Sequence, residues 1–361
     1  MADSSGPRRA TLSDVARSAG VSMSTASVVF SGKTKVSDAT SARVRVAAAE
    51  LGYTGPDPMA ASLRTGRSGI VAVVLEGQLR TAFADPVTVP MMDGLADGLA
   101  SLGAGILLLR DEPTSDDAAS LATAPVDAVV LIGCSGRTRE SLEIVRRRGL
   151  PVVVIEGDAG EGIPRISLDN HQAAKGLARY IRGLGHEKVA IVTLPLDSGC
   201  ERGPIDRQRM ERASVEVSID RLSGVADVFP EAHAVSAGGS SIDEGVIAGR
   251  TLLADRSSRP TAVLAQSDLL AAGVIRAAEE LGLRVPEDVS VAGFDGVQVD
   301  GLGPHVLTTM VQPAAEKGRA AGEQVAKMLR GEDATSLDLT CTFRAGTTTA
   351  RLEPLDSQSQ L

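Results

Sequence analysis

Apolar positions in the first 52 residues recur at helical spacing and are interrupted by glycine and small polar residues. The pattern predicts three short helices. Their N-caps are Thr11, Ser22 and Ser37, and they extend to about Ala19, Phe30 and Leu51. Gly20 and Gly52 follow the first and third helices and are typical of helix ends.

From Gly69 onward the pattern changes, because apolar runs rich in β-branched residues alternate with helical stretches. Seven strands are predicted: Ile70–Leu75, Ile106–Leu109, Ala128–Ile132, Val152–Ile155, Val189–Leu194, Thr261–Ala265 and Val289–Phe294. Continuous apolar strands indicate parallel sheets that helices cover on both faces. The alternation of strand and helix favours a doubly wound α/β fold, and the length fits two such sheets.

The predicted fold class is an all-α helix-turn-helix headpiece followed by an α/β body of two doubly wound, parallel-sheet lobes. The expected segments are a tail at 1–10, the headpiece at 11–55, a hinge at 56–68 and the body at 69–361. Within the body we expect lobe 1 at about 69–184 and 306–330, and lobe 2 at about 185–305 and 331–361.

The charge of the chain is unevenly distributed. Residues 1–68 hold nine Lys/Arg and five Asp/Glu, whereas the remainder holds 28 and 41. A basic head on an acidic body fits a protein that touches phosphates at one end. The three cysteines are odd in number and widely spaced, which argues against a disulfide framework or zinc site. No apolar run reaches the roughly 20 residues of a membrane helix, and the start does not resemble a secretory signal. We therefore expect a cytoplasmic, nucleoid-associated protein.

The second predicted helix carries the most informative polar positions of the head. It begins with Ser22-Met23-Ser24-Thr25. In a helix-turn-helix unit this helix enters the major groove N-terminus first. Small hydroxyl groups and the helix N-terminus itself both bind phosphates there. The alternative is that three short helices form a structural cap.

Residues 11–68 resemble the headpiece of the LacI/GalR repressor family. The resemblance rests on Leu12-Ser13-Asp14-Val15-Ala16, Ala19-Gly20-Val21-Ser22, Ser24-Thr25-Ala26-Ser27, Val36-Ser37, Ala49-Glu50-Leu51-Gly52-Tyr53 and Leu63-Arg64-Thr65-Gly66-Arg67-Ser68. It implies a sequence-specific transcriptional regulator, a repressor, that binds double-stranded DNA at a pseudo-palindromic operator as a homodimer. A tetramer stays open as an alternative.

By this resemblance Met23, Ser24 and Val28 sit where the family reads base edges, while Thr25, Ser27 and Ser31 face phosphates. Val28 stands where the family often has an arginine that bonds guanine, so readout here should depend less on guanine. The alternative is that Val28 belongs to the core. Thr11 and Ser22, at the helix starts, complete the DNA-contacting set of this helical part.

The family carries Ala-x-x-Leu in a hinge helix, and this chain has Ala60-Ala61-Ser62-Leu63. The resemblance implies that Leu63 wedges into the minor groove and bends the DNA. Arg64 and Arg67 flank it and suit phosphates, or serve only solubility. Two such segments meet at the operator centre, one from each subunit.

The body resembles the family's periplasmic-binding-protein-like core. The matches are Leu184-Gly185-His186, Ser267-Asp268, residues 282–295 and the stretch Leu307-Thr308-Thr309-Met310-Val311-Gln312-Pro313. In doubly wound sheets ligands bind beyond the carboxyl ends of the strands. Carried over by residue, the expected contacts for a small-molecule effector are Arg209, Ser267, Asp295, Gln312 and Phe294. Alternatively, Asp295 caps a turn and Arg209 lies on a solvated helix face.

The effector pocket departs from the family pattern. Val87 and Thr88 stand where the family usually places aromatic residues, and the whole chain has five Phe, two Tyr and no Trp. The resemblance implies a sugar, a nucleoside or another small polar molecule as the effector. The departures weaken the case for a sugar and leave a small polar or acidic metabolite, or a pocket that has lost its ligand, as alternatives. The effector could weaken or strengthen DNA binding.

We expect no cofactor and no metal, since the four histidines are scattered. Gly32-Lys33-Thr34 resembles the end of a phosphate loop, but the first glycine of that motif would fall at Ser27. The two alternative classes are a solute-binding protein and a sugar-processing α/β enzyme. The headpiece argues against the first, and the lack of an evident acid–base pair argues against the second.

Overall fold

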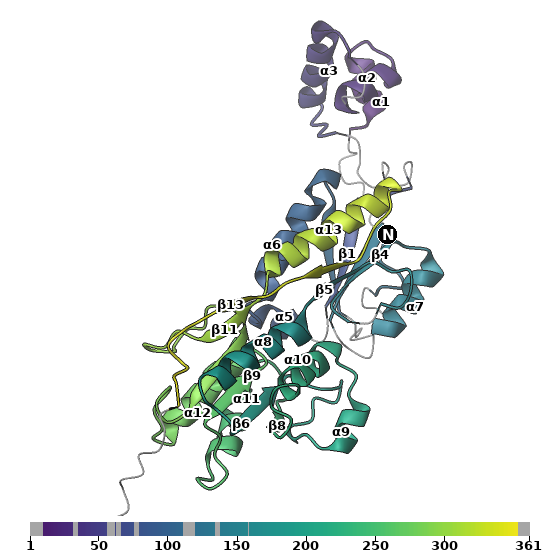
Figure 1. Cartoon of the computed structure of the whole chain (residues 1–361). Helices are drawn as coiled ribbons and strands as arrows, with labels where there is room; N and C mark the ends of the chain where they lie inside the picture. Colours follow the sequence, from purple (N-terminus) through teal and green to yellow (C-terminus); the bar gives the residue numbers. More distant parts are fainter. Residues whose placement is uncertain are drawn as a thin grey trace, which may run out of the picture. The chain divides into compact units, whose positions relative to one another are not determined.

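The chain divides into two compact units, a head of Met1–Ser68 and a body of Gly69–Leu361 (Figure 1). The computed structural model describes residues 10–31, 35–55, 62, 66–75, 79–110, 120–133, 138–157 and 159–352.

Three helices form the described part of the head: α1 (Leu12–Ser18), α2 (Met23–Ser31) and α3 (Asp38–Glu50). They confirm the three predicted helices to within one or two residues at each end. Gly20 makes the turn between α1 and α2 at a φ of 63°, a left-handed conformation that glycine adopts without steric cost. The core consists mostly of small side chains, namely Val15, Ala16, Ala19, Ala26, Val29, Val44, Ala47 and Ala48.

The first sheet of the body has six strands in the order β12-β5-β4-β3-β1-β2, and all its pairings are parallel. The strands are β1 (Ile70–Leu75), β2 (Gly105–Arg110), β3 (Ala128–Ile132), β4 (Val152–Ile155), β5 (Arg165–Leu168) and β12 (Leu337–Leu339). One apolar cluster packs α6 (Thr88–Leu99) and α13 (Ala314–Arg330) against the sheet, and a separate cluster packs α7 (Thr138–Arg148). The short helices α5 (Leu79–Ala84) and η1 (Ala100–Leu102) flank α6.

The second sheet has seven strands in the order β13-β11-β10-β9-β6-β8-β7. Five are parallel to one another: β6 (Val189–Thr193), β8 (His233–Ser236), β9 (Ala262–Ala265), β10 (Ser290–Asp295) and β11 (Thr308–Val311). The two antiparallel edges are β7 (Gly203–Pro204) and β13 (Thr342–Arg344). One apolar cluster holds α8 (Asn170–Gly183) and α10 (Glu216–Ala226), and another holds α11 (Ile242–Leu253) and α12 (Asp268–Glu280). The predicted fold class is thereby confirmed.

The chain crosses between the two sheets three times, between β5 and α8, between β11 and α13, and between β12 and β13. These crossings correct the expected lobe limits. β11 pairs with β10 in the second sheet, so lobe 1 does not resume at 306, and β12 pairs with β5 in the first sheet, so it does not end at 330. Likewise α8 packs on α10 of the second lobe, so lobe 1 ends near Leu168 rather than at 184.

Helices α6 and α13 lie side by side along the first sheet (Figure 1) and approach each other closely at glycines. A Cβ atom on Gly94 of α6 would overlap the backbone of Ala315, and a Cβ atom on Gly318 of α13 would overlap the backbone of Met91. The two backbones are thus closer than any larger residue permits, and the apolar cluster beneath them depends on this spacing.

Gly318→Ala should lower the free energy of unfolding by about 1–3 kcal/mol, because the added methyl group forces the two helices apart. Gly176 is the matched control: it is exposed in α8, and a Cβ atom there meets nothing within 4 Å. Gly176→Ala should raise the stability by about 0.5–1 kcal/mol, since alanine favours the helix. Urea unfolding followed by circular dichroism measures both. Equal effects of the same sign would contradict the close packing of α6 and α13.

Candidate DNA-binding and effector sites

The N-terminal end of α2 carries several hydroxyl groups at the surface of the head. Ser22 Oγ lies 2.8 Å from both Ser24 Oγ and Thr25 Oγ1, and it accepts a hydrogen bond from Thr25 N at 3.1 Å. Ser22 and Ser24 are exposed, and Met23 between them is 58% exposed. Because the helix N-terminus also carries a partial positive charge, this end of α2 suits a phosphate or a base edge.

The remaining predicted positions of α2 lie beside this polar end. Val28 follows Ser24 by one helical turn, which places both on one face of the helix. Ala26 and Val29 fill the buried face, while Ser27 and Val28 are half-buried. Val28 is therefore partly accessible to a binding partner, whereas the neighbouring Val29 is buried.

The other predicted DNA contacts differ in what the structure says of them. The Thr11 hydroxyl forms the cap of α1, since it donates to Asp14 Oδ2 at 2.7 Å and accepts from Asp14 N at 3.3 Å. Ser31 is the last residue of α2. Leu63 and Arg64 lie outside the described residues, as does most of the predicted hinge helix.

In the body, two predicted effector contacts meet at the carboxyl ends of neighbouring strands. Asp295 ends β10, and Gln312 follows β11. Gln312 Nε2 donates to Asp295 Oδ1 at 2.7 Å, and Gln312 N donates to the Asp295 carbonyl at 3.1 Å. Asp295 has a φ of 108°, which L-residues rarely adopt. Strained backbone of this kind is often found at functional sites.

Arg221 of α10 is a residue of this candidate site that sequence reasoning missed. It is 4% exposed, and its guanidinium lies 3.6 Å from the centre of the Phe294 ring. Its Nη1 donates to the Gln266 carbonyl at 2.6 Å and lies 3.4 Å from Asp295 Oδ1, while its Nε donates to Asn170 Oδ1 at 2.9 Å. Arg221 thus binds groups at the ends of two strands, where a ligand was expected.

Two further buried side chains, Glu156 and Lys317, link Asn170 back to Gln312. Asn170 Nδ2 donates to Glu156 Oε2 at 3.1 Å. Lys317 Nζ of α13 donates to Glu156 Oε1 at 3.2 Å and to Gln312 Oε1 at 2.7 Å. Glu156 follows β4 and, like Asp295, has a positive φ, here 57°. We call this set the hinge ring; its members are Glu156, Asn170, Arg221, Asp295, Gln312 and Lys317.

The other three predicted effector contacts already have partners within the protein. The Arg209 guanidinium donates to the backbone carbonyls of Glu201, Gly203 and Pro204, so it holds the loop before α9 (Arg207–Arg212). Ser267 is 1% exposed and caps α12 through a bond from Leu270 N.

Phe294 is 2% exposed and lies in the core under Arg221. The stacking face expected of Phe294 is therefore covered by a side chain of the protein itself.

Burial raises the pKa of two carboxylic acids at these strand ends. It raises the pKa of Asp295 from 3.8 to about 7, although Arg221 and the bond from Gln312 act in the opposite direction. Burial also raises the pKa of Asp268 to about 6, against a 2.6 Å bond from Thr309 Oγ1. The desolvation of both carboxylates indicates a site that water enters poorly.

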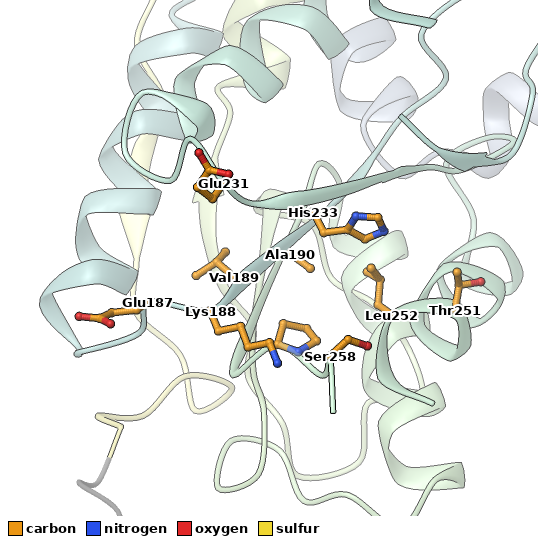
Figure 2. Close-up of a pocket in the computed structure, with 10 residues that line it drawn as sticks. Glu187, Lys188, Val189, Ala190, Glu231, His233, Thr251, Leu252 and Ser258 are labelled. Atoms are coloured by element: carbon orange, nitrogen blue, oxygen red, sulfur yellow. The ribbon is translucent and has the colours of Figure 1, made fainter. Parts of the chain in front are cut away.

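A separate hollow of about 620 Å³ lies at the opposite end of the second sheet. Figure 2 shows Lys188, Val189 and Ala190 at the start of β6, next to His233 at the start of β8. These are the amino ends of the strands, whereas ligands of doubly wound sheets bind at the carboxyl ends. Within the described part of the chain, no group of three or more His, Cys, Asp or Glu side chains is placed to hold a metal ion.

The sequence matches two known protein families. Residues 11–55 match the bacterial regulatory proteins of the lacI family, and residues 178–346 match the periplasmic binding protein-like domain. The chain is 32% identical over 352 residues to the HTH-type transcriptional regulator IpsA of Corynebacterium glutamicum, covering 94% of this chain and 97% of that protein. It is 29% identical over 331 residues to the transcriptional repressor CytR of Escherichia coli, covering 90% and 91%.

Solved structures have the same fold. A LacI-family regulator from Corynebacterium glutamicum aligns with a TM-score of 0.68 at 28% identity, over 95% of this chain and all of that one. The lac repressor dimer bound to operator and the anti-inducer ONPF aligns with a TM-score of 0.77 at 22% identity, with the same coverage.

The head and the two-sheet body, with these matches, define a DNA-binding transcriptional regulator of the helix-turn-helix class. The chain belongs to the lacI family of bacterial regulatory proteins. IpsA and CytR are both named as transcriptional regulators and not as enzymes. No helix in the described ranges is long and apolar enough to cross a membrane.

Val28→Arg should create a preference for guanine at one position of each half-site, because arginine can donate to both guanine acceptors. The expected discrimination is about 1–3 kcal/mol. In vitro selection of binding sites from random DNA measures it. Val46→Arg adds the same charge at an exposed position of α3 and serves as the control. An unchanged consensus for Val28→Arg would show that position 28 does not face the bases.

The raised pKa of Asp295 predicts how stability depends on pH. The folded state holds the Asp295 proton more tightly than the unfolded state, so this stabilisation is complete below about pH 4 and is lost as pH rises through about 7. The free energy of unfolding of the wild type, relative to Asp295→Asn, should fall by roughly 2–4 kcal/mol over that range. Denaturant unfolding at several pH values measures it.

Asp288→Asn is the control for this pH dependence. Arg284 lowers the pKa of Asp288 to about 2, so Asp288 stays ionised from pH 4 to 7. The stability difference between the wild type and Asp288→Asn should change there by less than about 0.5 kcal/mol. A wild type that gains stability relative to Asp295→Asn over this range would contradict the raised pKa.

Proposed function

We propose that this protein is a repressor that acts in the cytoplasm as a homodimer on a pseudo-palindromic operator, and that a small polar metabolite between the two lobes controls its DNA affinity. The observation that carries the proposal is the exposed, hydroxyl-rich N-terminal end of α2 on a packed three-helix head. The basic charge of residues 1–68 supports the same reading, since cationic side chains attract the DNA backbone.

For the DNA contacts we propose the hydroxyl groups of Ser22, Ser24 and Thr25, together with the exposed side chain of Met23 and the half-open Val28. Ser27 and Ser31 continue the same helix toward its end. Thr11 would act mainly through the cap of α1, which orients the helix that packs on α2. Leu63 and Arg64 are proposed from the sequence as the minor-groove wedge and its flanking cation.

For the metabolite we propose Asp295 and Gln312 as the principal contacts, because both lie at strand ends and bear polar groups. Arg209, Ser267 and Phe294 would shape the site from behind, since each is engaged within the protein. The lac repressor structure holds operator and an anti-inducer, and CytR is named a repressor. We extend that two-ligand arrangement to this chain and propose no catalytic activity.

A genome-wide map of bound DNA, followed by titration of the mapped site, tests the proposal. The purified protein should bind that site at least roughly a thousandfold more tightly than shuffled duplex, with an affinity that falls steeply as salt rises. Metabolites connected with the neighbouring genes should change the affinity by roughly 5- to 150-fold. Equal affinity for mapped and shuffled DNA at every salt concentration would refute the proposed function.

A pair of charge variants tests whether the DNA contact lies on α2. Ser24→Asp puts a negative charge at the exposed start of α2 and should weaken binding at least about tenfold by repelling phosphates. Ser18→Asp makes the same change at the exposed last residue of α1 and should have a smaller effect. Equal losses in both variants would mean that charge alone, and not the position on α2, determines binding.

A further inference from the structure

The hinge ring closes on itself. Asp295 accepts from Arg221 and Gln312, Arg221 donates to Asn170, Asn170 donates to Glu156, and Lys317 donates to both Glu156 and Gln312. When its acids are ionised the ring holds two cations and two anions. Its four charged members are each less than 10% exposed. Such buried charges are stable only while they remain paired.

The ring lies where the chain crosses between the sheets. Asn170 begins α8 directly after the first crossing, and Gln312 lies in the second crossing, between β11 and α13. Glu156 and Lys317 belong to the first lobe, since they follow β4 and lie in α13. The bonds Asn170–Glu156 and Lys317–Gln312 therefore fasten two of the three crossings to the first lobe. Rotation of one lobe against the other requires these segments to change conformation.

Arg221 also fills the place that ligand groups would take. It binds the carbonyl of Gln266 after β9 and the carboxylate of Asp295 at the end of β10, and it covers the ring of Phe294. A guanidinium over an aromatic face gains a cation–π attraction that strengthens when water is excluded. The acceptor and the aromatic face expected to receive a metabolite are both occupied from within.

We propose that Arg221 is an internal occupant of the effector site, and that through it the hinge ring latches the two lobes in this arrangement. The proposal rests on the proposed function for the identity of the site. An effector then acts by replacing Arg221 on Asp295. That exchange favours a molecule whose amino group, guanidino group or paired hydroxyl groups donate hydrogen bonds to Asp295 in place of Arg221. Such a molecule also needs an acidic group that receives the displaced guanidinium.

Chemical rescue tests the internal occupant. Arg221→Ala removes ethylguanidinium from the side chain and leaves Asp295 without its cation, which should lower the Tm by roughly 5–15 °C. Added ethylguanidinium should bind in the space and raise the Tm of Arg221→Ala with a saturable dose dependence. Ethylurea has the same shape without the charge and should not restore it.

Arg182 provides the matched control, because its guanidinium also lies over a phenylalanine, Phe229, at 4.7 Å, but outside the ring. Ethylguanidinium should leave Arg182→Ala and the wild type unchanged. No rescue of Arg221→Ala, or equal rescue by ethylurea, would overturn the proposal.

A second variant tests the latch and does not depend on the folding of Arg221→Ala. Lys317→Met keeps the length and apolar stem of the side chain but opens the ring at Gln312 and Glu156. Amide hydrogen exchange at residues 168–170, 311, 312 and 314 should then become at least roughly tenfold faster, because these segments open more often. Lys175→Met removes a lysine from a 2.6 Å ion pair with Asp227 on the second lobe and should leave those amides unchanged. Wild-type exchange rates in Lys317→Met would overturn the latch.

Neither readout involves DNA. If both tests give the expected results but the protein shows no specific operator binding, the latch proposal stands and the proposed function is wrong. If the protein binds its operator but ethylguanidinium does not rescue Arg221→Ala, only the proposal that Arg221 is an internal occupant is wrong.

Discussion

Four ionisable side chains are buried where the two sheets of the body meet, and each needs a partner whenever it carries a charge. Asp295 and Glu156 accept hydrogen bonds at the ends of β10 and β4, and the backbone of both residues has a positive φ. Arg221 and Lys317 reach them from helices on different lobes. Each cation pairs with an acid of its own lobe, so the neutral amides of Asn170 and Gln312 provide the links between the lobes. Leu339 packs against the apolar cores of both lobes beside them. The lobes are therefore joined at this point by buried hydrogen bonds between charged groups and amides.

Sequence periodicity predicted the strands whose residues are mostly apolar and the helices whose apolar residues recur at helical spacing. All seven predicted strands exist. Six of them are mostly buried, as expected of parallel strands covered on both faces, whereas β2 is an edge strand with one buried residue. The strands that periodicity missed are short or polar. β12 and β13 are edge strands with mostly exposed residues. β11 begins with Thr308 and Thr309, which are fully buried because their hydroxyl groups bond Thr349 and Asp268.

The candidate effector site was harder to predict, because its distinctive residues carry no motif. Asp295 and Gln312 were found through strand ends and family resemblance. Arg221 was missed although it has a sequence signal: it lies four residues from both Val217 and Val225, on the apolar stripe of α10. A cation in the phase of the core is rarely buried without a partner. Its partners come from strands and helices distant in sequence, so periodicity alone could not identify them.

The three crossings have a consequence for synthesis on the ribosome. The head is a contiguous segment that can fold soon after it emerges. The first sheet is not contiguous, since α13 and β12 follow the whole second sheet except its edge strand β13. Until Ala314–Arg330 has been translated, α6 has no helix against its glycines, and the apolar face of β1, β3 and β4 is incompletely covered. The lobe that begins first is thus completed nearly last, and the nascent chain carries a DNA-binding head before it has a finished body.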